Sequence, residues 1–484
     1  MALKGFTRNF KPLELLTGEQ LEAIHRGTLE VLENTGIKLE HERGLKLLEK
    51  NGCKVDYDEM RVRLPGRLVE ECLRKCPTSF HMKARDPKHD LIIGGNTLYF
   101  YTFSGMQTVD LNTWKPRTPT RKEFYDAITV LDALDNIHIF GPYVPWFGYE
   151  GVPPVMAMPE TAAAKFRNST KTHKEGYSNN SEIFTIQMAK AVGADLGISC
   201  MASPPLTYCS EAIEAAYRGI EADFPIFLVS GDVMGASSPS TIAGATLTNN
   251  AELIAGIVLT QLIRPGAKVL LQNMTTPQDM RSGYPAFGDV ACSLHNAVFC
   301  QYFRRLGVPI QTQSNGPSSS KRADFQCGYE KTFGALAAAL SGAHLVGMYG
   351  SLYGELSWHP VQAILDDDVA GMIGRFLEGV AVSEETLAID LIAEVGPIPG
   401  HYLNKEHTRK WWRKEQFMPK VADRLTYPEW METGQKSTLD YAQERMEEIL
   451  ATHRTKPLTA AEESEIERIL NEAEAYYTKR GLLR

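Results

Sequence analysis

Eight short apolar segments, each followed by a helical pattern, constrain the fold of this chain more than any other feature. They recur about every 26 to 43 residues. Because parallel strands need a crossover connection, usually a helix, eight such units predict a (β/α)8 barrel. The predicted strands are 98–103, 137–144, 172–179, 199–206, 225–231, 268–274, 308–314 and 343–348, and the helical patterns between them are 121–134, 159–168, 182–192, 211–222, 251–264, 289–306 and 329–340.

An open, doubly wound α/β sheet is the alternative to a barrel. That fold usually carries a glycine-rich phosphate-binding turn after its first strand. Residues 102–110 read TFSGMQTVD at this position, which is not such a turn. The count of eight strands therefore favours the barrel.

The pattern divides the chain into three regions. Residues 1–95 mix amphipathic helices and short strands, with a helix start at Thr17, and predict an N-terminal α+β cap. Residues 96–360 form the barrel that carries the active site. Residues 361–484 are helical, pack on the barrel and end in two long charged helices. Those helices could pack on the barrel or on a second subunit, and we expect a homo-oligomer.

Composition excludes several classes of partner. The formal net charge of −8 argues against a nucleic-acid or anionic-membrane surface. No apolar run is long enough to span a membrane, and the N-terminus lacks the apolar region of a signal peptide. The eight cysteines form no CxxC pair, so we expect them to be reduced. A cytoplasmic protein is the expectation.

Aromatic and neutral polar side chains gather where the predicted strands end, which is where barrel enzymes place their active sites. Aromatic faces beside a carboxylate are suited to an organic cation, because a ring attracts an ammonium group by roughly 0.5 to 2 kcal/mol. We predict that the rings line a methylammonium pocket, that Glu355 attracts the cation, and that the amides and His359 bind a substrate carboxylate. The candidate residues are Tyr101, Phe103, Tyr143, Trp146, Tyr177, Tyr349, Gln313, Asn315, Glu355 and His359.

Each candidate also has a structural interpretation. A single aromatic residue at a strand end can cap the core, Glu355 can be a solvated loop acid, and His359 can begin a helix before Pro360. The acidic run 366–368 is typical of a helix start or a charged face. These alternatives stay open at the level of sequence.

No nucleophile or resident cofactor is evident. The chain has no GxSxG elbow, GxGxxG turn, P-loop or HExxH pair, and no Schiff-base lysine is recognisable at a strand end. We therefore predict no metal site. The sequence indicates a cation-binding barrel whose attacking group is supplied by another molecule.

Several longer motifs resemble one family. They are SGAHLVGMYGSLYGELSWHP (341–360), ILDDD (364–368), VSEETLAIDLIAEVGPIPGHYLNKEHT (382–408), YPEWMETG (427–434), NAELIAGIVLTQLIRPGAKV (250–269) and SNGPSSSKRADFQCGYEKTFGALAAALSGA (314–343). Together they resemble the trimethylamine methyltransferase superfamily of corrinoid-protein methyltransferases, over essentially the whole chain. This chain has only the standard twenty residues. It thus resembles the branch without pyrrolysine.

The resemblance implies a (β/α)8 fold and methyl transfer from a quaternary amine to Co(I) of a corrinoid. Glycine betaine is the first candidate substrate, followed by proline betaine and carnitine. The corrinoid would be held by a separate partner protein, so no cofactor is expected to be bound permanently. In the family-like segment, His407 and Thr408 would close over the cavity, meet the corrinoid partner, or make only structural contacts. A non-catalytic betaine-binding barrel and a metal-free lyase on a small acid remain as alternatives.

Overall fold

The eight predicted strands form a closed parallel barrel in the computed structural model, which describes residues 5–313 and 316–483. Neighbouring strands follow chain order, and the eighth pairs back onto the first, with Gly347 opposite Tyr101. The barrel prediction is confirmed, because an open sheet would leave two unpaired edges. The strands are β7 (Thr97–Thr102), β10 (Ile139–Phe140), β11 (Thr172–Glu175), β12 (Leu196–Met201), β14 (Ile226–Ser230), β16 (Val269–Asn273), β18 (Ile310–Thr312) and β19 (Leu345–Tyr349).

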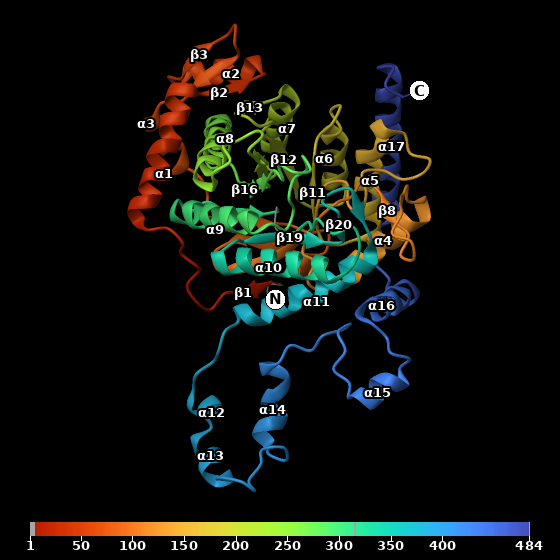
Figure 1. Ribbon diagram of the computed structural model, residues 1–484. Coiled ribbons are helices and arrows are strands. Elements are labelled where there is room, and N and C mark those ends of the chain that lie inside the picture. The colour runs from red at the N-terminus through yellow and green to blue at the C-terminus, as the bar shows by residue number, and fades with distance from the viewer. Residues whose placement is uncertain (1–4, 314–315, 484) are drawn as a thin grey trace.

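Helices cover the outside of the barrel (Figure 1). Side-chain caps start several of them: Thr120 and Glu123 form a capping box, and Asp324 accepts a hydrogen bond from the Cys327 amide. Gly342, at φ 96°, ends a helix in the left-handed conformation that glycine adopts without strain. The helices are α4 (Arg121–Ala133), α5 (Ala157–Asn168), α6 (Glu182–Ala191), α7 (Ser210–Glu221), α8 (Ile242–Ile263), α9 (Val290–Arg305), α10 (Phe325–Ser341) and α11 (Pro360–Leu377).

Helix α11 packs against β19 and α10. We therefore propose that the barrel extends to Leu377, past the boundary at residue 360 that the sequence indicates. Helix α8 is the one helix among the described residues that is long and apolar enough to cross a membrane. Of its most apolar window, 72% is buried inside the protein.

The N-terminal region packs on one side of the barrel and below it. Helices α1 and α3 lie against α8, and the capping box at Thr17 confirms the predicted start of α1. Strand β1 pairs antiparallel with β7. The elements are β1 (Phe6–Thr7), α1 (Gly18–Glu30), β2 (Ile37–Leu39), α2 (Glu42–Lys50), β3 (Lys54–Asp56), β4 (Arg61–Arg63), α3 (Gly66–Leu73), β5 (Ser79–Met82) and β6 (Leu91–Gly94). A short helical turn at Val31–Thr35 follows α1, and another at Pro87–His89 lies between β5 and β6. A third such turn, Pro154–Met156, precedes α5 in the barrel.

The hairpin β5–β6 closes the floor of the barrel. Its inward side chains form one buried cluster with the lowest layer of barrel side chains, so the interior is filled at this end. The cluster consists of Phe80, Leu91, Ile93, Tyr99, Tyr101, Ile139, Phe227, Leu270 and Leu345. A site for a small molecule is therefore confined to the opposite end, where the strands finish. Short ladders border that end: β8 (Thr108–Val109), β9 (Pro116–Arg117), β13 (Thr207–Tyr208), β15 (Val233–Met234), β17 (Thr276–Pro277), β20 (Ser351–Leu352) and β21 (Ser357–Trp358).

The C-terminal region begins with an arm that hangs away from the barrel (Figure 1). The structure describes every residue of its four helices, and none of them is buried. The chain then returns, and its last two helices pack on the barrel of the same chain, against α4, α5, α6 and α11. The elements are α12 (Glu384–Leu387), α13 (Ile389–Val395), α14 (Glu406–Glu415), α15 (Tyr427–Glu432), α16 (Thr438–Thr452) and α17 (Ala460–Lys479).

The acidic run Asp366–Asp368 is buried, contrary to the charged-face interpretation. Asp366 pairs with the buried Lys331 at 2.8 Å and accepts a hydrogen bond from the Gly350 amide at 2.8 Å. Lys331 also donates to the Ser351 carbonyl at 2.9 Å. Asp367 accepts from the Asn136 amide, and Asp368 from two amides of the returning C-terminal segment. Each aspartate thus fixes a different segment on α11.

Replacing Asp366 with Asn should lower the free energy of unfolding by about 3–5 kcal/mol, because it leaves the Lys331 ammonium buried without its counter-charge. Urea unfolding followed by circular dichroism measures the loss. The matched control, Asp390→Asn on the exposed face of α13, should change little. Replacing the pair together, Lys331→Met with Asp366→Leu, should recover part of the loss. If Asp366→Asn were as stable as the control Asp390→Asn, the Lys331–Asp366 pair would have no structural role.

A second buried polar network lies between the strands β14 and β16 and the helix α8. The Ser230 hydroxyl lies 2.9 Å from an Asp232 oxygen and 2.7 Å from a Glu252 oxygen. The Leu206 amide donates to Glu252 at 2.7 Å. Burial, followed by the nearby Asp232 charge, raises the pKa of Glu252 to about 8. Burial therefore favours the protonated form of this carboxyl.

This network makes a prediction for the pH dependence of stability. A carboxyl whose pKa is raised by folding destabilises the folded state increasingly as pH rises from about 4.5 to about 8. The variant Glu252→Gln cannot ionise, so its stability relative to the native protein should increase between pH 5 and pH 9. We expect a relative gain of about 1 to 3 kcal/mol, measured by urea titrations at each pH. A constant difference across this range would show that Glu252 is ionised throughout.

Candidate active site

A cavity of about 270 Å³ opens at the carboxyl ends of the barrel strands. Strands β7, β11, β12 and β16 contribute to it, as do the segments that follow β7, β10, β11, β16, β18 and β19. The volume is below the roughly 300–1,000 Å³ of pockets for drug-sized ligands, so it suits a smaller molecule. The lining residues are Tyr101, Ser104, Pro142, Tyr143, Phe147, Lys174, Gly176, Tyr177, Ser199, Met201, Gln272, Met274, Gln313 and Glu355.

Five of the residues predicted from the sequence lie around this cavity: Tyr101, Tyr143, Tyr177, Gln313 and Glu355. They come from five different strands or their following loops and meet only because the barrel is closed. Asn315, predicted to bind a carboxylate, lies outside the described residues.

The other four predicted residues do not line the cavity. Phe103 is buried in the core. The Trp146 indole donates to the Trp358 carbonyl at 3.1 Å, and the two rings pack edge to face. His359 is the N-cap of α11, where its Nδ1 accepts from the Val361 amide at 3.1 Å, and burial lowers its pKa to about 4. The structural interpretation thus describes these three residues.

Tyr349 lies away from the cavity for a different reason. Side chains that alternate along β19 would direct it inward, but the pairing of β19 with β7 shifts register between Gly347 and Tyr349. A bulge of this kind re-aims the next side chain. The Tyr349 hydroxyl instead lies outside the barrel and donates to Asp367 on α11 at 3.3 Å.

Lys174 is the residue that the sequence reasoning missed. It lies in the middle of β11 and is 1% exposed, with its ammonium group in the cavity. Its Nζ lies 5.6 Å from the centre of the Tyr101 ring and 5.0 Å from that of Phe227. Burial lowers the pKa of Lys174 to about 7. The signal in the sequence was the run HKE at 173–175, three ionisable residues inside a barrel strand.

A chain of amides continues from Lys174 across the bottom of the cavity. Lys174 donates to the Gln272 side-chain oxygen, and the Gln272 amide donates to the side-chain oxygen of Gln313. The side-chain oxygens of Gln272 and Gln313 both accept hydrogen bonds in this series, so the amide nitrogen of Gln313 is left to donate. The deep end of the cavity therefore offers hydrogen-bond donors and, when Lys174 is protonated, a positive charge.

The upper wall of the cavity is aromatic. The rings of Tyr143 and Phe147 stack, with centroids 4.6 Å apart, and Tyr177 lies opposite, after β11. Tyr143 has φ 55°, an uncommon conformation for a residue with a side chain, and such strain is concentrated at functional sites. Below them, Tyr101 fits only because Gly141 and Gly347 have no side chains: a Cβ at either would lie 2.9 Å or 3.1 Å from it.

Glu355 closes the outer side of the cavity from the hairpin β20–β21. Among residues 5–313 and 316–483, no hydrogen bond or ion pair to its carboxylate is present. Burial raises its pKa, and no neighbouring cation offsets the burial. An unpaired, partly desolvated carboxylate beside aromatic rings is suited to a cation supplied by a ligand.

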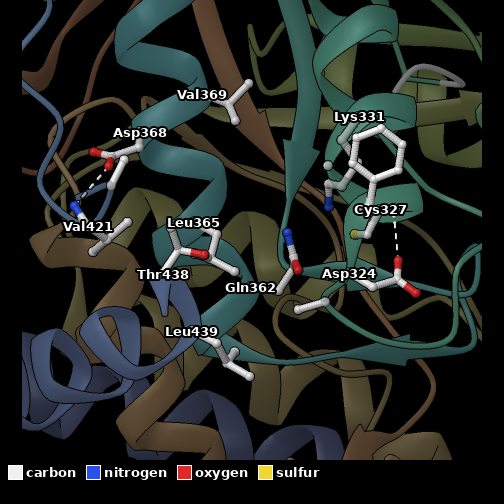
Figure 2. A pocket seen from close by; sticks show the side chains of 14 residues that line it. Asp324, Cys327, Lys331, Gln362, Leu365, Asp368, Val369, Val421, Thr438 and Leu439 are labelled. Carbon is white, nitrogen blue, oxygen red and sulfur yellow. Dashed lines mark hydrogen bonds between the residues drawn. The ribbon is translucent and has the colours of Figure 1, made fainter. Parts of the chain in front are cut away.

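A cavity of about 450 Å³ lies outside the barrel between α10, α11 and the returning C-terminal segment, with Lys331 and Cys327 on one wall and Asp368 and Val421 on the other (Figure 2). No barrel strand ends in it.

His407 and Thr408 lie on α14 in the arm, where His407 hydrogen-bonds the Glu385 carbonyl and Thr408 the Tyr402 carbonyl. In the described part of the chain, no cluster of His, Cys, Asp and Glu side chains is arranged to hold a metal ion.

Comparison with known proteins places the chain in a family. The family model described as trimethylamine methyltransferase matches residues 1–475. The trimethylamine methyltransferase MttB of Desulfitobacterium hafniense is 31% identical over 95% of this chain and 94% of its own. A glycine betaine methyltransferase of the same species is 30% identical, over 91% and 92%. The crystal structure of the Methanosarcina barkeri monomethylamine methyltransferase covers 89% of this chain and 92% of its own at 12% identity and a TM-score of 0.47. The chain therefore belongs to the trimethylamine methyltransferase family of methyltransferases.

Proposed function

We propose that the protein transfers a methyl group from a quaternary amine that carries a carboxylate, glycine betaine first, to the cobalt of a corrinoid held by a partner protein. The observation that carries this proposal is the polarity of the cavity. Its deep end has the buried Lys174 and a donor amide, its wall is aromatic, and its outer side has the unpaired carboxylate of Glu355. A betaine has the complementary order of charges.

In this arrangement the betaine carboxylate lies against Lys174 and Gln313, and the trimethylammonium group lies among Tyr143, Phe147 and Tyr177 beside Glu355. The deep end is closed, so the methyl groups face the open mouth of the barrel. A methylamine without a carboxylate would leave the donors at the deep end unpaired and would place a cation in the same small cavity as Lys174. A relative named for glycine betaine supports the same substrate class.

The chemistry is an in-line displacement. The bond between nitrogen and one methyl carbon breaks, its electron pair stays on nitrogen, and the amine leaves uncharged. The methyl acceptor, reduced cobalt in a corrinoid on the partner, provides the electron pair for the new bond. No acid is required from this chain. Its residues bind the two charged ends, orient one methyl group toward the mouth and exclude water.

Other betaines fit the same charge order. Proline betaine and carnitine also combine a quaternary nitrogen with a carboxylate, and the cavity volume of about 270 Å³ limits how bulky the link between them can be. A betaine-binding barrel without methyl transfer has the same binding features. A transfer assay separates these possibilities.

The direct test mixes the protein with Co(I) cobalamin under strong reductant and follows methyl-Co(III) absorbance with a panel of betaines and methylamines. We expect methylation with glycine betaine or another betaine and none with trimethylamine. Betaine binding by calorimetry without methylation would favour the non-catalytic alternative. Transfer from trimethylamine at the same rate as from every betaine would contradict the assigned polarity.

Betaine affinity should depend on pH through Lys174. A bound carboxylate favours the protonated lysine, whose pKa is about 7 in the free protein, so affinity should fall as pH rises from 7 to 9. Lys174→Met should weaken betaine binding by about 10- to 100-fold, the range of a charge-assisted hydrogen bond, and should remove the pH dependence. Calorimetry measures both effects.

The control for this test is Lys190→Met on the exposed end of α6, which should bind betaine as the native protein does. Tetramethylammonium, which has no carboxylate, should bind Lys174→Met no more weakly than the native protein. Equal loss of betaine and tetramethylammonium binding would show that Lys174 maintains the shape of the cavity instead of binding a carboxylate.

A further inference from the structure

A second cavity of about 240 Å³ adjoins the first on the other side of Glu355. The loops after β16, β18 and β19 build it, and Glu355 lines both cavities. Its wall is almost entirely apolar or aromatic: Tyr284, Pro285, Phe287, Ser319, Tyr353, Glu355 and Leu356. One unpaired carboxylate therefore serves two adjacent aromatic spaces.

The ring of Tyr353 is held in place by its backbone. Tyr353 has φ 48°, a strained value for a residue with a side chain. Its amide donates to the Ser320 carbonyl at 2.7 Å, and the next amide, of Gly354, donates to Ser318 at 2.8 Å. The ring of Phe287 packs directly on Gly354, where a Cβ would lie 2.4 Å from it. Tyr353 and Gly354, which also has a positive φ, begin the turn between β20 and β21, so the hairpin fixes where the Tyr353 ring lies.

The Tyr353 ring already contacts an ammonium group of the protein. The exposed side chain of Lys321 places its Nζ 4.6 Å from the centre of this ring. The Tyr284 ring lies 6.4 Å from that of Tyr353 and is tilted by 39°, so the two rings form an open wedge. A free ammonium ligand in this wedge would compete with Lys321 for the Tyr353 ring at little cost, because the exposed lysine returns to water.

We propose that this second cavity is an outer binding subsite for small quaternary ammonium ions, which compete with Lys321 for the Tyr353 ring. Tyr353 and Tyr284 provide the ring faces, and Glu355 provides the counter-charge shared with the inner cavity. The inner cavity has a positive deep end, whereas the outer one has no cationic side chain besides the displaceable Lys321 in its described surroundings. The outer subsite therefore recognises the ammonium group alone, without a carboxylate.

The consequence for catalysis rests on the proposed function. A betaine would bind first by its ammonium end in the outer subsite and then pass Glu355 into the inner cavity, where the carboxylate meets Lys174. The outer subsite would thus govern capture of the substrate and leave the transfer step itself unchanged.

The test is a titration of the whole protein with tetramethylammonium chloride, by calorimetry. Tyr353→Leu and Tyr284→Leu should each weaken the outer binding event by about three- to tenfold, the range expected for one ring at a partly exposed site. Lys321→Gln should strengthen it several-fold, since the competing ammonium is gone. Tyr329→Leu, which removes an exposed ring on α10 that lines neither cavity, is the matched control and should change nothing. Tetramethylarsonium soaked into crystals gives an anomalous arsenic peak that locates the site.

Unaltered tetramethylammonium binding in Tyr353→Leu, Tyr284→Leu and Lys321→Gln would overturn the proposal. Lys321→Gln keeps the test valid even if the Tyr353 variant loses the loop, because Lys321 is an exposed residue. This readout needs no methyl transfer, so it is independent of the proposed function. If betaines are turned over, Tyr353→Leu should lower kcat/KM three- to tenfold with kcat unchanged; an unchanged kcat/KM would show that the outer subsite is not on the route of the substrate.

Discussion

The buried ion pair between Lys331 and Asp366 is the interaction on which the mouth of the barrel depends. Through Ser351 and Gly350 it fixes both residues that follow β19 to two barrel helices, α10 and α11. The hairpin that begins there carries Tyr353 and Glu355. A buried pair of this kind contributes little net stability compared with apolar side chains, but losing one partner is expensive. Its value here is positional: it places a carboxylate between two cavities.

The fold could be predicted from sequence because it follows from local patterns. Each βα unit has its own apolar run and its own caps, and the closed barrel is the arrangement that pairs all eight strands. The approximate place of the site also followed, since residues that come after parallel strands meet at one end. Tyr101, Tyr143, Tyr177, Gln313 and Glu355 surround one cavity for this reason.

The predicted residues that do not line the cavity lie elsewhere for identifiable physical reasons. Tyr349 points outward because of a register shift in β19, which depends on how two strands pair and leaves no local signature. Trp146 and His359 serve packing and capping, roles that depend on neighbours far along the chain or on the exact helix start. Lys174 does not stand at a strand end, where barrel sites are expected, because the cavity extends one layer below the strand ends.

The polarity of the cavity bears on the proposed function, in which a bound cation loses its charge. In that function Glu355 and the rings would stabilise the quaternary ammonium while it binds, and that stabilisation would be lost when the amine becomes neutral. Lys174 and the Gln313 amide would hold the carboxylate, whose charge does not change during transfer, so their contribution would be retained. Binding energy from the carboxylate end can therefore fix the methyl group in position without opposing the reaction. A site that bound only the ammonium group would lack this separation, and this is the physical reason to expect a zwitterionic substrate.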